Sequence, residues 1–311
     1  MIDFKTIDEQ IEIQKNRGLI FSDEAFAKNQ LILNNYYNVI NAYKDLYVIK
    51  NGQPDEHYKP DVTFENLYDT YLFDTQLKEI FLRNILKIEK AVKSAIAHIF
   101  AKNHVGDDYI DIQNFKNYVD KNGKFSTKTV VQLFKDRLNE KVKQNNKMIC
   151  HYHYKYQHVP IWVFVNVLTL GEITKLFTVM KDADQDDVSL LLSTATKNQI
   201  NTSELKRFLN ELTMVRNICA HNGRMYDYSS YINIDTNNFV YQNLPTMKRP
   251  KGIFKLLITI RSLLPKNEFD NMIVYELFPL IKNLSKISSL NDKTILKKMN
   301  LPEWWIMIYN I

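Results

Sequence analysis

The sequence predicts an all-α protein, and three observations support that prediction. Glycine and proline are scarce, with seven and eight among 311 residues, which leaves little material for the turns of an all-β fold. Apolar residues recur at helical spacing through residues 63–100. Residues that can cap a helix, such as Ser22 and Thr63, directly precede segments of this kind. We therefore expect helices to form the whole body of the molecule.

Three short helices are expected in the first fifty residues. The first covers 4–17 and ends at Gly18, the second begins after Ser22, and the third runs through YYNVINAYKDLY. The long segment that follows begins at Thr63. Its length allows a break near Asp74, because globular helices seldom run so far.

The middle of the chain alternates basic and apolar segments. Residues 116–147 read as a linker and a helix, and Pro160 opens an apolar element interrupted at Gly171. The acidic run DADQDD is a loop or the entry to a short helix. Thr202 or Ser203 then caps a helix that buries a leucine-rich stripe.

The C-terminal third gives weaker patterns. Residues 226–250 read as irregular, with room for a small hairpin around YINIDTNNFVY, and helical patterns return at 251–264 and 268–287. We divide the chain into an N-terminal helical segment (1–60), a helical core that carries the basic insertion (61–230) and a C-terminal helical extension (231–311).

The positive charge of the chain is concentrated in residues 116–147. This segment has nine basic and three acidic residues, so its net charge of +6 equals that of the whole chain. One interpretation is a solvated linker and helix; the other is a surface for a nucleic-acid backbone. The candidate RNA-binding residues here are Lys124, Lys128, Lys135, Arg137, Lys141 and Lys143.

Composition limits the compartment and the cofactors. Cys150 and Cys219 are too few for a disulfide framework, and no uncharged apolar stretch is long enough to span a membrane. The N-terminus has no apolar run typical of a signal peptide. We expect a soluble cytoplasmic protein. No glycine-rich phosphate-binding motif occurs, and no cofactor is expected.

The stretch MVRNICAHNGRMY, residues 214–226, concentrates candidate chemistry at the end of a helix. Asn217 and His221 are four residues apart and lie on one face, whereas Arg216 must reach around with its long side chain. Asn222 and Gly223 both tolerate positive φ, so the helix should end there. An imidazole at the negative end of a helix and a guanidinium together suit phosphoryl chemistry.

This stretch also resembles a known family. RNICAH resembles the arginine-to-histidine signature of the HEPN superfamily, and LNELTMVRNICAHNGRMYD resembles the terminal motif of its Abi abortive-infection family (the AbiD/AbiF-like group). The order and spacing are also similar for DEQIEIQKNRGLIFSDEAFAKNQLILNNYYNVINAY, YDTYLFDTQLKEIFLRNILKIEKAVKSAIAH and HYHYKYQHVPIWVFVNVLTLGEITKLF. The resemblance covers most of residues 5–230. Asn166 departs from it, because the family has a glutamate in that part of the element.

The resemblance implies a HEPN-type helical bundle and a metal-independent ribonuclease. Such proteins form symmetric homodimers in which the arginine and histidine of both protomers line one cleft. The ribose 2′-hydroxyl attacks the adjacent phosphorus and leaves a 2′,3′-cyclic phosphate. By this resemblance His221 transfers protons, Arg216 stabilises the transition-state charge, and Asn217 orients the histidine or the substrate.

Two further residues are candidates for supporting this site. Asn222 follows the histidine directly, and Glu89 is an upstream carboxylate that could pair with Arg216. The lysines around Glu89 favour another interpretation, a surface residue that balances their charge. A second branch of the superfamily carries a tyrosine two residues after the histidine. Gly223 stands there in this chain, which favours the ribonuclease over that branch.

A second cluster, CHYHYKYQH at residues 150–158, offers competing chemistry. Cys150 and its three histidines could bind zinc, but the chain has no second ligand cluster. Tyr154 could stack on a base with Lys155 near a phosphate. Packing against the helix that Pro160 opens is the favoured interpretation, so no metal is expected. Cys219 is interpreted as a core residue rather than a nucleophile.

The sequence therefore predicts a ribonuclease toxin of bacterial phage defence, with RNA as its substrate and without a membrane or metal partner. The hypothesis includes a noncoding RNA as antitoxin or guide, because residues 116–147 are strongly basic. The alternative is a catalytically inactive helical module that binds RNA or senses phage, with Arg216 and His221 holding a dimer together.

Overall fold

The fold is all-α, as the sequence predicts. The structure is a computed structural model, and it describes residues 3–49, 56–104, 106, 108–234, 238–244, 250–287 and 292–310. Within these ranges every regular element is helical, and β pairing is limited to isolated bridges such as Ile20 with Thr63.

The N-terminal segment consists of two regular helices and an irregular third. A capping box at Thr6 begins α1 (Ile7–Asn16), and Asp23, one residue beyond the predicted Ser22, caps α2 (Glu24–Asn34). The predicted third helix is not regular. It consists of a π-helical turn, Tyr37–Asn41, followed by a 3-10 turn, Lys44–Leu46.

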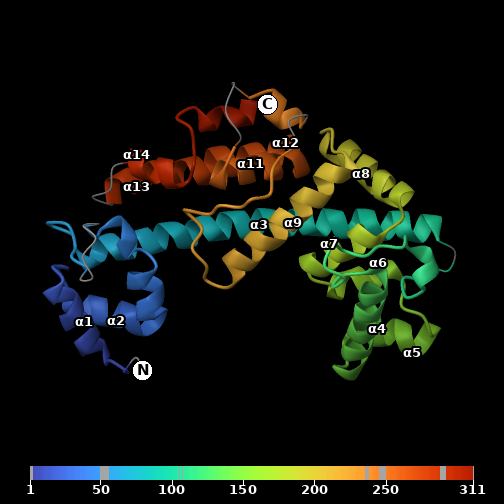
Figure 1. Cartoon of the computed structure of the whole chain (residues 1–311), viewed down its shortest axis with the longest axis horizontal. Helices are drawn as coiled ribbons and strands as arrows, with labels where there is room; N and C mark the ends of the chain where they lie inside the picture. Colours follow the sequence, from blue (N-terminus) through green and yellow to red (C-terminus); the bar gives the residue numbers. More distant parts are fainter. Residues whose placement is uncertain are drawn as a thin grey trace.

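One helix organises the molecule. α3 (Phe64–Asn103) begins at the predicted cap, Thr63, where a capping box closes the first turn. It runs the length of the molecule, with α1 and α2 near its first turns and the C-terminal helices along one side (Figure 1). Its forty residues correspond to roughly 60 Å of helix. The other segments are therefore positioned by where they meet α3.

The break allowed near Asp74 is wrong, because α3 continues through that residue without interruption. The Asp74 carboxylate is fully buried and accepts hydrogen bonds from the backbone N–H groups of Met225 and Tyr226, at 2.6–3.1 Å, and from the Tyr43 hydroxyl at 2.8 Å. Burial raises the pKa of Asp74, and these donors oppose the rise by stabilising the carboxylate. A polar residue in the apolar stripe thus ties distant segments to α3.

The basic segment and the apolar element form a group of helices near the end of α3 (Figure 1). Ser126 caps α4 (Thr127–Lys143), and α5 (Lys147–Tyr156) follows after a tight turn. The apolar element is interrupted earlier than predicted, because α6 (Ile161–Phe164) ends before Gly171 and Thr169 caps a separate helix, α7 (Leu170–Val179).

Two further helices pack on α3. The acidic run DADQDD begins α8 (Asp182–Thr196), so of the two predicted alternatives, a loop or the entry to a helix, the second is confirmed. α9 (Thr202–Ala220) is capped by Asn201 rather than by Thr202 or Ser203. Its leucines face the core, and it crosses α3 while also packing on α7 (Figure 1). α9 delivers the arginine and histidine of the motif.

The C-terminal extension is also helical. It contains α10 (Phe239–Gln242), α11 (Gly252–Leu263), α12 (Lys266–Asn271), a π-helical stretch Met272–Leu277, α13 (Phe278–Ile287), α14 (Asp292–Lys298) and a 3-10 turn Trp305–Asn310. The hairpin suggested around YINIDTNNFVY is wrong in its described part, which forms no strand and ends in α10. Residues 235–237 of that stretch lie outside the described residues.

A buried ion pair attaches the extension to α9. The ammonium of Lys255 in α11 lies 3.1 Å from the Glu211 carboxylate, and both side chains are almost fully buried. Tyr228 and Thr259 also donate to this carboxylate. Breaking a buried pair leaves an uncompensated charge, so this contact fixes the extension strongly against the core.

We expect the substitution Asp74→Asn to lower the free energy of unfolding by about 1–3 kcal/mol, because it leaves buried donors without an anionic acceptor. Tyr43→Phe removes one donor only and should cost about 1 kcal/mol. Urea unfolding followed by circular dichroism measures both losses. An Asp74→Asn protein as stable as the parent would contradict the assigned role of this carboxylate.

Candidate functional site

The end of α9 has the geometry that the sequence predicts. α9 ends at Ala220, His221 is its C-cap residue, and Asn222 adopts the left-handed conformation with φ of 54°. The N–H of Gly223 donates to the carbonyl of Ile218 at 3.0 Å, which closes the helix end. A Cβ at Gly223 would lie 2.9 Å from the Ile218 side chain, so glycine is required by close approach. The histidine therefore stands directly at the C-terminal end of the helix.

The side chains of the motif are available for a ligand. Asn217, His221 and Asn222 are exposed, and Arg216 is half-buried. The Nε atom of Arg216 is buried without a hydrogen-bond partner among the described residues. The side chains of Asn217 and His221 likewise have no hydrogen-bond partner in that part of the chain. The Arg216 guanidinium and the His221 imidazole are thus about one and a half turns apart. Neither has a hydrogen-bond partner among the described residues that a ligand would have to displace.

The segment after His221 is fixed in place. Arg224 donates to the carbonyl of Ala42 at 2.8 Å and forms ion pairs with Asp45 at 3.0 Å and Asp227 at 2.5 Å. The next two residues bind the Asp74 carboxylate. These contacts join the N-terminal segment, α3 and the motif. The exposed end of α9 is consequently held on a rigid support.

Cys219 lies within the motif but belongs to the core, as the sequence suggests. Its side chain is buried, and burial raises the pKa of the thiol to about 12. A thiol with this pKa stays protonated at neutral pH, and the thiolate is the nucleophilic form. Its position favours packing over covalent catalysis.

Glu89 is buried, so the favoured interpretation as a surface residue is wrong. Only 8% of it is exposed, and its Oε1 atom forms an ion pair with Lys93 at 2.6 Å. No hydrogen bond to Arg216 occurs among the described residues. The Oε2 atom of Glu89 is buried and has no hydrogen-bond partner in the described part of the chain. Its carboxylate thus balances a lysine, as expected, but does so beneath the surface.

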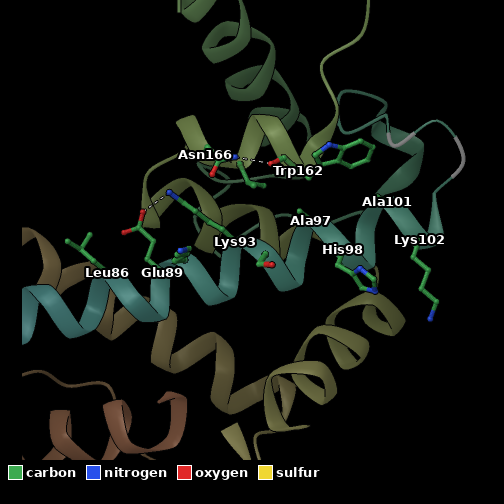
Figure 2. A pocket seen from close by; sticks show the side chains of 12 residues that line it. Leu86, Glu89, Lys93, Ala97, His98, Ala101, Lys102, Trp162 and Asn166 are labelled. Carbon is green, nitrogen blue, oxygen red and sulfur yellow. Dashed lines mark hydrogen bonds and ion pairs between the residues drawn. The ribbon is translucent and has the colours of Figure 1, made fainter. Parts of the chain in front are cut away.

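Glu89 lines a groove between α3 and α6 that the sequence did not predict. The groove has a volume of about 830 Å³, and three lysines, Lys90, Lys93 and Lys102, lie along it. Figure 2 shows Glu89, Lys93 and Asn166 at one end and the Trp162 ring toward Ala101 and Lys102. Arg216 and His221 do not line this groove. The sequence shows these lysines, but it does not show that Trp162, in a later segment, lies beside them.

Four of the predicted RNA-binding lysines form an exposed surface on and beside α4. Lys128, Lys135 and Lys143 are exposed on the helix, and Lys124 is exposed just before it. Lys141 is half-buried and donates to Gln144 at 2.8 Å. The segment therefore presents positive charge to solvent from a rigid helix.

Arg137 differs from these lysines because its guanidinium is used within the fold. It donates twice to one oxygen of Glu172, at 3.0 and 2.5 Å, and once to Glu140 at 2.6 Å. Burial raises the pKa of Glu172, but the Thr169 amide and Arg137 outweigh burial, so the net pKa is lowered. The contact joins α4 to α7.

The cluster at residues 150–158 is mostly exposed, so packing against α6 explains little of it. Tyr152 packs on the core, whereas Tyr154 and Lys155 face solvent, and Lys155 lies 5.2 Å from the centroid of the Tyr156 ring. Among the described residues no three histidine, cysteine or acidic side chains come together as metal ligands. The exposed tyrosine and lysine stay candidates for contact with a nucleic acid.

The family of the chain follows from comparison with known proteins. The family model for Abi-like proteins matches residues 29–227, a range that begins within α2 and includes the whole motif at the end of α9. The chain belongs to this family, which associates it with abortive infection, a bacterial defence against phage. No curated protein and no solved structure matches the chain. In the described part of the chain, no helix combines the length and apolar character that crossing a membrane requires.

The Arg137–Glu172 pair predicts a pH-dependent contribution to stability. Because the pKa of Glu172 is lowered on folding, its contribution is present above the ordinary glutamate pKa of 4.5 and is lost as pH falls through the lower folded value. We expect Arg137→Gln to lower the free energy of unfolding by about 1–3 kcal/mol at pH 7. The difference from the parent should shrink as pH falls from 5 toward 3.

Urea unfolding at several pH values checks this expectation. The matched control is Lys135→Gln, since Lys135 is exposed on the same helix and should leave stability within about 0.5 kcal/mol of the parent. A constant difference for Arg137→Gln across the whole pH range would show that the Glu172 charge is not what this arginine stabilises.

Proposed function

We propose that the protein is a metal-independent endoribonuclease toxin that acts in abortive infection. The observation that supports the proposal most directly is the end of α9, where the half-buried Arg216 and the exposed His221 have no internal hydrogen-bond partner among the described residues and the segment that follows is fixed. Membership of the Abi-like family supplies the defence context. The fold and the motif agree with the HEPN resemblance of the sequence.

The reaction needs little beyond a proton carrier and a cation. The ribose 2′-oxygen attacks the adjacent phosphorus, the bond from phosphorus to the 5′-oxygen breaks, and a 2′,3′-cyclic phosphate remains. One proton leaves the 2′-hydroxyl and one is delivered to the departing 5′-oxygen; His221 is the group placed to carry them. Arg216 stabilises the charge that grows on the phosphate oxygens. Asn217 lies one turn before His221 and orients the imidazole or the substrate.

A homodimer would complete this chemistry. The transfer needs a proton acceptor and a proton donor, whereas each chain brings one histidine to the motif. Two copies of the end of α9 facing one another would supply both. Sedimentation at twice the 36.8 kDa of the chain would support this assembly. A monomer that retains full cleavage activity would contradict it.

The exposed lysines of α4, together with Tyr154 and Lys155, would guide RNA to the protein. Contacts between lysines and phosphates contribute an affinity that falls as the salt concentration rises. An exposed tyrosine ring offers a face on which a base can stack. The same surface suits a noncoding RNA that restrains or directs the toxin. RNA of defined length that copurifies with the protein would support such a partner. A preparation without nucleic acid that stays inactive would count against it.

We expect the purified protein to cut total bacterial RNA in excess EDTA and to leave 2′,3′-cyclic phosphate ends. His221→Ala should lower the rate at least 100-fold, because proton transfer by a positioned side chain contributes roughly 10²–10⁴-fold. Arg216→Ala should lower it by a similar factor through loss of charge stabilisation. Gel analysis of the fragments and chemical mapping of their ends measure both effects.

Matched controls separate these effects from loss of structure. His57→Ala removes an exposed histidine outside the motif, and Arg207→Ala removes an arginine from the same helix. Both should cleave RNA like the parent. Equal cleavage by His221→Ala would overturn the proposed mechanism. If the parent and its variants all bind RNA but none of them cleaves it, the inactive binding module is favoured instead.

A further inference from the structure

The groove between α3 and α6 combines features that the end of α9 does not use. Lys90 and Lys102 are exposed along it, and Trp162, 54% exposed, lies at the end near Lys102 (Figure 2). Positions 86 and 102 of α3 both line the groove and are roughly 24 Å apart along the helix. A groove of this length can hold several units of an extended chain.

Charge in the groove favours an anionic ligand. Its lining contains three lysines, Lys90, Lys93 and Lys102, and one carboxylate, that of Glu89. Lys93 pairs with Oε1 of this carboxylate, which leaves the lysines at both ends of the groove to face a ligand. The spacing of Lys90 and Lys102, three turns apart, suits successive charges along a backbone rather than one compact anion.

The Trp162 ring indicates that the anionic chain carries bases. Trp162 belongs to α6, and its backbone carbonyl accepts a hydrogen bond from the Asn166 side chain at 2.8 Å, which fixes the short helix. An exposed indole on a fixed helix offers a flat face for stacking. Bases stack on such rings whatever their identity, whereas an acidic peptide gains little from them.

Glu89 supplies a third and independent indication. Its side chain is nine-tenths buried and lines the groove, while its Oε2 atom has no hydrogen-bond partner among the described residues. Buried carboxylate oxygens are normally satisfied, and a shift of this side chain toward the groove would let it accept a hydrogen bond from a ligand. The ribose 2′-hydroxyl is a donor that RNA has and DNA lacks.

We propose that this groove binds single-stranded RNA, with a base stacked on Trp162, phosphates on Lys90 and Lys102, and a ribose hydroxyl donating to Glu89. The inference rests on the proposed function, because it takes RNA as the substrate. It adds a contact site away from Arg216 and His221, which do not line the groove. The groove would hold the strand while the end of α9 cuts it.

The test is titration of the His221→Ala protein, which should not cleave, with a 12-nucleotide oligouridylate while tryptophan fluorescence is recorded. Binding should quench the fluorescence, and the additional substitution Trp162→Phe should remove most of the quench.

Trp162→Ala should weaken binding roughly tenfold. Lys90→Gln should reduce the salt slope of log affinity by about 1. Glu89→Gln should reduce the preference for the ribose over the deoxyribose oligomer.

Two matched controls lie outside the groove. Tyr231→Ala removes an aromatic side chain that is 88% exposed, and Lys87→Gln removes a lysine of the same helix that pairs with Glu268. Both should bind the oligonucleotide like the parent. Binding and quenching unchanged by Trp162→Ala would overturn the groove proposal. If poly-glutamate displaces the oligonucleotide equally well from the parent and from Trp162→Ala, the proposal is overturned in favour of an acidic peptide.

Failure of the groove and failure of the proposed function are distinguishable. If the parent cuts RNA through His221 while Trp162→Ala binds normally, the groove proposal alone is wrong. If the protein binds the oligonucleotide through Trp162 but the parent cuts no RNA, the ribonuclease proposal is wrong and the groove stands.

Discussion

The position of the candidate site depends on the buried carboxylate of Asp74. A buried carboxyl group must be matched by hydrogen-bond donors, and here they come from Tyr43 and from the backbone of Met225 and Tyr226. Those donors belong to the N-terminal segment and to the chain just beyond the motif. One side chain on α3 therefore determines where the segment after His221 lies.

Two further charged contacts extend the same principle. Lys255 and Glu211 hold the C-terminal extension on α9, and Arg137 and Glu172 hold α4 on α7. In each case the charge is satisfied inside the fold and is not offered to a ligand. Two of the buried polar atoms that have no hydrogen-bond partner among the described residues, Arg216 Nε and Glu89 Oε2, lie at the motif and in the groove.

The sequence predicted the features that depend on local physical chemistry. The helical class, the capping of α3 by Thr63 and the end of α9 after His221 follow from side-chain periodicity and from residues that tolerate positive φ. The break allowed near Asp74 is the opposite case, because segment length is a local criterion that does not reveal the distant donors to this carboxylate. Two of these donors, the amides of Met225 and Tyr226, are more than 150 residues away in the sequence, and Tyr43 is 31 residues away.

The candidate site was partly predictable for the same reason. The motif is local, so Arg216, Asn217 and His221 could be named as candidates from one stretch of sequence and its resemblance to the HEPN signature. The burial of Glu89 and the groove beside it could not, because they arise where α6 packs on α3. Likewise, Arg137 resembles its neighbouring lysines in the sequence, and only its contact with α7 shows that its charge is satisfied. Contacts between distant segments decide what local patterns leave open.

The central claim is that RNA is cut by its own 2′-hydroxyl at the end of α9. The most direct measurement uses a short RNA with a single 2′-deoxyribose placed at a mapped cleavage position. The account predicts that cutting at that linkage disappears while other cleavable linkages in the same molecule are still cut. Cleavage that persists at the substituted linkage would contradict the account, because the attacking oxygen would have to come from elsewhere.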